Sequence, residues 1–189
     1  MRAGALGIIP DSIAFGRNID YTTPITRIEF AGIMVRVFEV FSGTAAMPAA
    51  SNPFSDTDDI NASKAFNAGI MIGFSETEFM PDSLLNREQA ATALTRVYKR
   101  TTIEGWSFAA DADFSLSFAR PAPFADDGDI SDWARESVYF MASHRIILGI
   151  GGNRFVPRAT TAAQEDAGVA NTTREQAIAI ALRLIENLL

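Results

Sequence analysis

A four-residue sequence motif, called the phrase below, occurs three times and constrains the fold of this chain. It reads Thr26-Arg27-Ile28-Glu29, Asn86-Arg87-Glu88-Gln89 and Thr173-Arg174-Glu175-Gln176. In each copy a Thr or Asn is followed three residues later by Glu or Gln. This is the spacing of a capping box, in which the two side chains satisfy free amides at the start of a helix. The phrase therefore predicts three helices, each with its arginine at the first helical position.

The residues after each phrase repeat one apolar spacing. Counted from the arginine, positions +3, +6, +7, +10 and +11 are largely apolar in all three copies. Because these positions form one stripe on a helix of 3.6 residues per turn, we expect the three helices to pack together. A further arginine recurs at +9, and we expect it to cover the core with its stem and pair with a carboxylate. These residues are Arg36, Arg96 and Arg183.

Composition limits the classes of partner. The 189 residues are 48% hydrophobic and 21% charged, as in an ordinary folded domain. The net charge of −7 argues against broad attachment to nucleic acid or to an anionic membrane, so local arginines would have to hold any anionic partner. The absence of cysteine excludes disulfides and thiolate metal sites, and no cofactor is indicated. No apolar run is long enough to span a membrane, and the first residues lack the layout of a signal peptide.

Further motifs recur in a fixed order around the phrase. The third copy is the most complete, with Phe124-x-Asp126, Trp133-Ala134, Ile146-Ile147-Leu148-Gly149 and Phe155-x-Pro157 before its arginine. The second copy lacks the tryptophan, and the first begins in its middle. We therefore expect a single domain with repeat one at 1–41, a linker at 42–53, repeat two at 54–100, a connection at 101–123 and repeat three at 124–189. Repeat three also carries an inserted loop from Ala159 to about Ala170.

This order of motifs resembles that of S-layer homology (SLH) domains. The resemblance implies a mainly α fold, in which three repeats form a pseudo-threefold arrangement around a central three-helix bundle with short extended segments. It also implies an extracellular module, associated with the cell wall or S-layer, that binds anionic and often pyruvylated secondary cell-wall polysaccharide in grooves between repeats. The candidate ligand-binding residues that it implies are Arg27, Arg87, Arg174, Asp56, Asp126, Trp133, Gly73 and Gly149.

Several of these residues also have a purely structural interpretation. A guanidinium beside the free amides of a helix start suits a carboxylate or phosphate, but each arginine could instead bridge to an Asp of a neighbouring repeat. Trp133 is expected mainly to pack in the core, on the buried side of a helix from about 131 to 143. The aspartates of Phe-x-Asp are expected to cap a helix or turn. The Asp-rich runs 56–59 and 126–129 lack a full calcium loop, so no metal site is predicted.

Two functions remain open from the sequence. The first is a noncatalytic anchoring module that binds an anionic cell-wall glycan, and the second is a structural or protein-interaction module whose glycan grooves have degenerated. Enzyme activity is not expected, because no catalytic constellation is present. His144 directly follows Ser143, and adjacent helical residues point in different directions. Other domains of a larger surface protein are further expected partners.

Overall fold

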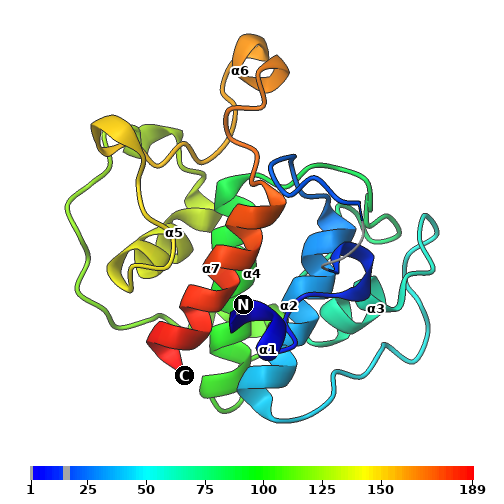
Figure 1. The fold of residues 1–189 in the computed structure, drawn as a ribbon. Coiled ribbons are helices and arrows are strands. Elements are labelled where there is room, and N and C mark those ends of the chain that lie inside the picture. Colours follow the sequence, from blue (N-terminus) through cyan, green and yellow to red (C-terminus); the bar gives the residue numbers. More distant parts are fainter. Residues whose placement is uncertain (1, 15–17) are drawn as a thin grey trace.

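The computed structural model describes residues 2–14 and 18–189 and is built mainly from helices (Figure 1). Met1 and residues 15–17, which belong to the expected repeat one, lie outside the described residues. The α-helices are α1 (Arg2–Ala5), α2 (Arg27–Ser42), α3 (Ile60–Asn67), α4 (Arg87–Thr102), α5 (Asp132–Ser143), α6 (Ala162–Asp166) and α7 (Arg174–Leu188). Short 3-10 turns are η1 (Asp11–Ile13), η2 (Phe108–Asp113), η3 (Asp127–Asp129) and η4 (Gly151–Asn153). Extended segments in the described part of the chain pair through isolated bridges, so the mainly α prediction is confirmed.

The three longest helices begin at the arginines of the repeated phrase, as predicted. Their first residues are Arg27, Arg87 and Arg174. In each helix the cap side chain accepts a hydrogen bond from the third helical amide, while the Glu or Gln at that position accepts from the cap amide. Loss of one such cap typically costs about 0.5–2 kcal/mol. The capping boxes therefore fix the starts of all three helices.

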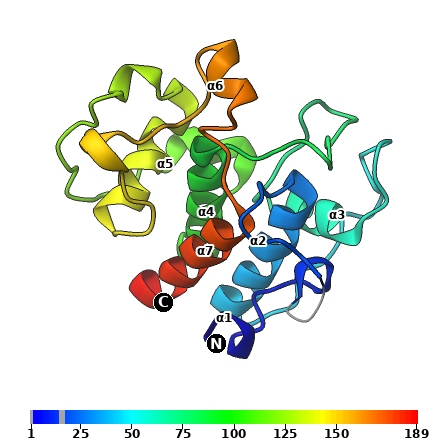
Figure 2. The ribbon, with the colours of Figure 1, turned by 45° about the horizontal axis from the view of Figure 1, so that its top comes forward.

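α2, α4 and α7 pack on one another, as their common apolar register predicts. α2 contacts both other helices, and α4 also contacts α7. Figure 2 shows the three helices grouped at the centre of the molecule. Side chains from the predicted stripes are fully buried, namely Phe30, Ile33, Met34, Ala90, Leu94, Val97, Ala177, Ala181 and Leu184. The expectation that the three helices share one core is confirmed.

The segments that precede these helices hydrogen-bond to one another in a closed ring. The amide of Ile25 donates to the Thr172 carbonyl (2.8 Å), the amide of Thr172 to the Leu85 carbonyl (2.8 Å), and the amide of Leu85 back to the Ile25 carbonyl (3.2 Å). Isolated bridges join the same segments, pairing Pro24 with Thr173, Thr26 with Leu84 and Asn86 with Asn171. The ring therefore holds the three helix N-termini beside one another at one end of the bundle.

Two shorter helices flank the bundle, α3 against α2 and α5 against α4. α5 buries Ala134, Val138 and Met141, which are spaced four and three residues apart on one face. Trp133 lies beside this face and is 58% exposed. The expectation that Trp133 packs in the core is therefore wrong, because the α5 surface that meets α4 starts one residue later.

The connection between α4 and α5 packs on the domain through its aromatic side chains. Trp106 is buried and its indole Nε1 donates to Asp111 (2.7 Å). The buried Lys99 ammonium of α4 lies 2.9 Å from the same carboxylate and 3.1 Å from Glu136 of α5. These two ion pairs link α4 to the connection and to α5, and so hold the connection against α4.

Candidate ligand-binding groove

The aspartates of the two Phe-x-Asp motifs hold the loops that carry the Phe-x-Pro anchors. Asp56 accepts from the amides of Phe79 (2.9 Å) and Met80 (2.7 Å). These hydrogen bonds, that of Phe79 first, hold the pKa of Asp56 below its ordinary value of 3.8 against the opposing effect of desolvation. Met80 has φ 57°, in the left-handed region that non-glycine residues adopt uncommonly.

Asp126 makes the same pair of contacts in the third motif set. Its two oxygens accept from the amides of Phe155 and Val156, each at 2.7 Å. Val156 has φ 58°, which is especially unfavourable for a β-branched residue. Both aspartates therefore hold a turn, which agrees with the structural interpretation of the Phe-x-Asp motif.

Arg27 holds the other side of the first of these loops. Its Nε donates to the Phe79 carbonyl (2.9 Å) and its Nη2 to the Ile72 carbonyl (3.0 Å). The guanidinium carbon lies 5.0 Å from the centre of the Phe79 ring, within the range of a cation–π contact. Burial lowers the pKa of Arg27, and the charge of Asp56 opposes this shift. The arginine at the start of α2 thus fixes a loop some fifty residues further along the chain.

Arg87 repeats this arrangement one motif set later. It donates to the carbonyls of Phe155 and Leu148, each at 2.8 Å, and lies 5.1 Å from the Phe155 ring centre. Burial lowers the pKa of its guanidinium, and Asp126 opposes the shift. Each of these two arginines therefore contacts the loop of the following expected repeat.

Arg174 differs, because a carboxylate of the protein already pairs with it. Its Nη2 lies 2.7 Å from Glu29 Oε1, and its Nε donates to both Glu29 oxygens at 3.0 Å. Glu29 is also the acceptor that completes the capping box of α2. The bridging interpretation therefore describes Arg174, with a glutamate in place of the expected aspartate.

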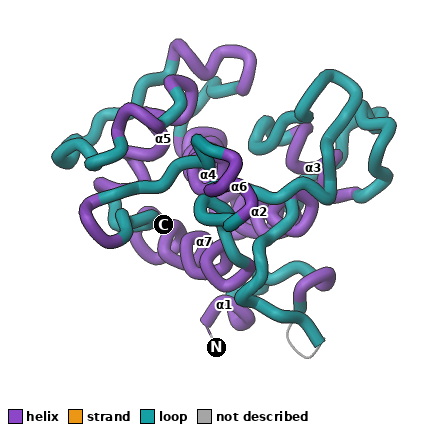
Figure 3. The backbone as a smooth tube through the Cα atoms, turned by 90° about the horizontal axis from the view of Figure 1, so that it is seen from above, coloured by secondary structure: helices purple, strands orange, loops and turns teal. Residues whose placement is uncertain are grey.

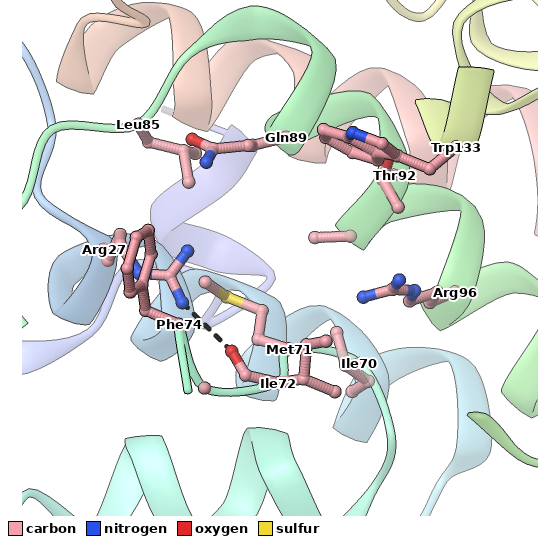
Figure 4. A pocket seen from close by; sticks show the side chains of 12 residues that line it. Arg27, Ile70, Met71, Ile72, Phe74, Leu85, Gln89, Thr92, Arg96 and Trp133 are labelled. Carbon is pink, nitrogen blue, oxygen red and sulfur yellow. Dashed lines mark hydrogen bonds between the residues drawn. The ribbon is translucent and has the colours of Figure 1, made fainter. Parts of the chain in front are cut away.

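A groove of about 480 Å³ lies beside Arg27, between the loop after α3, the side of α4 that carries Gln89 and Arg96, and the start of α5 (Figure 4). Its lining residues are Arg27, Ile70, Met71, Ile72, Gly73, Phe74, Leu85, Gln89, Thr92, Ala93, Arg96 and Trp133. The groove thus brings together three of the candidate site residues, Arg27, Gly73 and Trp133. The other five candidates, Arg87, Arg174, Asp56, Asp126 and Gly149, are not among its lining residues.

Arg96 faces Arg27 across this groove (Figure 4), although its repeated position in the sequence predicted only a pairing with a carboxylate. Figure 4 shows the two guanidinium groups entering the groove from opposite sides. Arg96 lies 4.7 Å from the Phe108 ring centre, and its buried Nε has no hydrogen-bond partner among the described residues. Burial lowers its pKa, and Asp111 opposes the shift. Among the described residues no carboxylate forms an ion pair with Arg96, so the expected pairing is wrong there, whereas Arg36 does pair with Glu39 at 3.3 Å.

Two exposed aromatic side chains border the same groove. Phe74 is 73% exposed and Trp133 is 58% exposed, on opposite sides of the pocket in Figure 4. Binding pockets commonly combine such aromatic surface with a few polar groups that set the orientation of the ligand. Phe74 was missed from the sequence because it carries no motif of its own and follows Gly73 directly.

Gly73 and Gly149 permit a close approach between each loop and the phenylalanine of its Phe-x-Asp motif. A Cβ at Gly73 would lie 2.2 Å from the Ser75 carbonyl oxygen and 2.7 Å from the Phe54 ring. A Cβ at Gly149 would lie 3.0 Å from the Phe124 ring. Both glycines therefore have a packing role, and Gly73 also lines the groove.

The charged groups that line this groove are the guanidinium groups of Arg27 and Arg96. Throughout residues 2–14 and 18–189, no three His, Cys, Asp or Glu side chains lie where they could hold a metal ion. Over the same ranges, no helix has both the length and the apolar character required to cross a bilayer. The groove lining includes two guanidinium groups, two aromatic rings and the side-chain amide of Gln89.

Comparison with known proteins adds two findings. Residues 123–161 match the family model of the S-layer homology domain, and this range includes Asp126 and Trp133. This segment is therefore similar to S-layer homology domains, and the match suggests a cell-wall anchoring module at the cell surface. An amylopullulanase of Thermoanaerobacterium thermosulfurigenes is 29% identical over an alignment of 167 residues that covers 86% of this chain. The chain spans only 8% of the length of that relative.

Proposed function

We propose that the protein is a noncatalytic, extracellular anchoring module whose groove beside Arg27 binds an anionic secondary cell-wall polysaccharide, such as a pyruvylated one. The observation that carries this proposal is the charge of the groove. Its lining contains Arg27 and Arg96 and, within the described residues, no carboxylate. The whole chain has a net charge of −7, so this local excess of positive charge runs against the composition.

The hydrogen bonds of Arg27 hold its guanidinium in a position to receive an anion. Carbonyl oxygens hold Nε and Nη2 of Arg27, while its Nη1 has no hydrogen-bond partner in the described part of the chain. A guanidinium already fixed in this way loses little conformational freedom when a ligand binds. A carboxylate or phosphate could then accept charge-assisted hydrogen bonds, while Phe74 or Trp133 covers the apolar face of a sugar ring.

We further propose that three repeats, at 1–41, 54–100 and 124–189, surround the bundle in a pseudo-threefold arrangement, with a linker at 42–53 and a connection at 101–123. The closed ring of hydrogen bonds among Ile25, Leu85 and Thr172 supports this organisation. The equivalent loop contacts of Arg27 and Arg87 support it as well. In this arrangement the module would serve other domains of a larger surface protein.

One observation favours a second candidate function, a structural or protein-interaction module with degenerate glycan grooves. Arg174 is paired with Glu29, and the incomplete repeat one offers it no Phe-x-Pro loop. This pairing removes one of the three arginines from the set available to an anion. The alternative requires that the Arg27 groove be empty of glycan as well.

The test is calorimetric titration with oligosaccharide fragments of an anionic cell-wall polymer. Arg96→Ala and Arg27→Ala should each remove a charge-assisted contact of about 1.5–3 kcal/mol, which is about a tenfold to hundredfold loss of affinity. Arg27→Lys should recover only part of the loss, because an ammonium lacks the planar fork. Arg100→Ala, on the exposed side of α4 outside the groove, is the matched control. Wild-type affinity in both groove variants, with the fold intact by circular dichroism, would favour the structural alternative.

A further inference from the structure

The inserted loop of the third motif set builds a second cleft next to the groove. This cleft has a volume of about 540 Å³ and lies between the segment 158–171 and the start of α4. α6 lies within the insertion, and seen from above in Figure 3 it overlies the end of the bundle where α4 begins. Gln89 lines both the groove and the cleft, so the two spaces meet at this side chain.

Amide side chains give the cleft its polar character. Asn86 and Gln89 use their oxygens in the capping box of α4, which leaves their NH₂ groups without a partner among the described residues. The side chain of Asn171 makes no hydrogen bond within that same part of the chain. Gln164, from α6, completes the amide lining. Amides that both donate and accept match the hydroxyl and acetamido groups of a sugar.

In the part of the chain that the structure describes, the cleft is lined by one cation and one carboxylate, whereas the groove is lined by two arginines and no carboxylate. Arg158 lines it together with Glu165, and the Arg158 guanidinium is 3.6 Å from the buried carboxylate of Glu88. Leu84 is 47% exposed and adds an apolar surface against which a ring face can pack. This lining favours an uncharged polar ligand over an anion.

We propose that the cleft is a second saccharide subsite, which binds an uncharged sugar of the same polymer beside the anionic sugar held by the groove. The inference rests on the proposed function, since the groove must first hold the polymer. The insertion accounts for the subsite. From the Phe of Phe-x-Pro to the arginine of the capping motif the spacing is eight residues for Phe79 and Arg87 but nineteen for Phe155 and Arg174. The added residues form one wall of the cleft.

The test compares two probes by calorimetric titration. The first is a methyl glycoside of a pyruvylated N-acetylhexosamine, and the second is a pyruvylated oligosaccharide of three to five sugars from partial hydrolysis of a cell-wall polymer. The wild type should bind the oligosaccharide at least tenfold more tightly than the monosaccharide. Asn171→Ala should lower oligosaccharide affinity about threefold to tenfold, and Glu165→Trp, which fills the cleft, should abolish the gain. Both variants should bind the monosaccharide as the wild type does, and the exposed Asn18→Ala is the control.

Each outcome has a distinct meaning. Wild-type binding of both probes by Asn171→Ala and Glu165→Trp would overturn the subsite and leave the groove proposal intact. An equal loss for both probes would also overturn it, because the cleft would then not act as a separate site. If the wild type binds neither probe, while Arg27→Ala behaves identically, the proposed function fails and the subsite fails with it.

Discussion

Replacement of Asp126 by alanine should destabilise the loop that carries Phe155 and Val156. The carboxylate is 7% exposed and accepts from two consecutive amides, each at 2.7 Å. Alanine would leave both amides without their acceptor, in a loop where Val156 must keep φ at 58°. A hydrogen bond to a charged group contributes about 1.5–3 kcal/mol, so two at the lower end amount to about 3 kcal/mol. At about 2–4 °C per kcal/mol for a domain of this size, the melting temperature should fall by about 6–12 °C.

The assay is urea unfolding followed by far-ultraviolet circular dichroism, with a thermal melt in parallel. Asp113→Ala is the matched control, because this exposed carboxylate makes no hydrogen bond or ion pair within the described structure and should keep the wild-type midpoint. Arg87 holds the Phe155 carbonyl from the other side of the loop. A double-mutant cycle between Asp126 and Arg87 should therefore give a coupling energy of about 0.5–3 kcal/mol. A wild-type urea midpoint for Asp126→Ala would refute this reasoning.

Three further substitutions test the bundle core, the Asp56 turn and the Arg174–Glu29 ion pair. Leu94→Ala, at a fully buried position in the bundle, should cost about 2–5 kcal/mol in urea unfolding, and an unchanged midpoint would place Leu94 outside the core. The folded-state pKa of Asp56 lies below 3.8, so its contribution to stability is present above that value and is lost as the pH falls through the lowered pKa. Asp56→Asn should therefore reduce the fall in the free energy of unfolding as the pH is lowered below about 4. The same acid dependence in wild type and variant would show that Asp56 does not stabilise the fold through its lowered pKa. Arg174→Ala should lower the melting temperature by unpairing Glu29 without changing polymer affinity, whereas a tenfold weaker affinity would put Arg174 in the binding site.

The helix framework was predictable because its signals are local. A capping box needs only four residues, so the starts of α2, α4 and α7 could be assigned from the chain itself. The shared apolar register then predicted that these helices meet. The start of α5 was expected at about 131 and lies at Asp132.

The candidate groove was less predictable because distant segments build it. Trp133 precedes the buried face of α5 by one residue, and only the packing of α5 on α4 shows that the indole is exposed. Arg96 recurs at a position shared with Arg36 and Arg183, so its pattern suggested a common role. Its actual environment depends on Phe108 of the connection, which local periodicity does not place.

The resemblance to SLH domains made Arg27 and Arg87 equally good candidates for binding a ligand. The structure gives both the same loop contacts, but the groove of about 480 Å³ is lined by Arg27. The difference comes from their surroundings. Arg27 is joined there by Arg96 and Trp133, side chains contributed by two later parts of the chain.

Co-sedimentation with purified bacterial cell walls tests most directly whether an anionic cell-wall polymer is the ligand. Walls that retain their secondary polymer should carry the protein into the pellet, and walls stripped of that polymer chemically should leave it in the supernatant. Arg96→Ala should reduce the pelleted fraction on intact walls, while Arg100→Ala should not. Equal sedimentation of the wild type with intact and stripped walls, or none with either, would contradict the account.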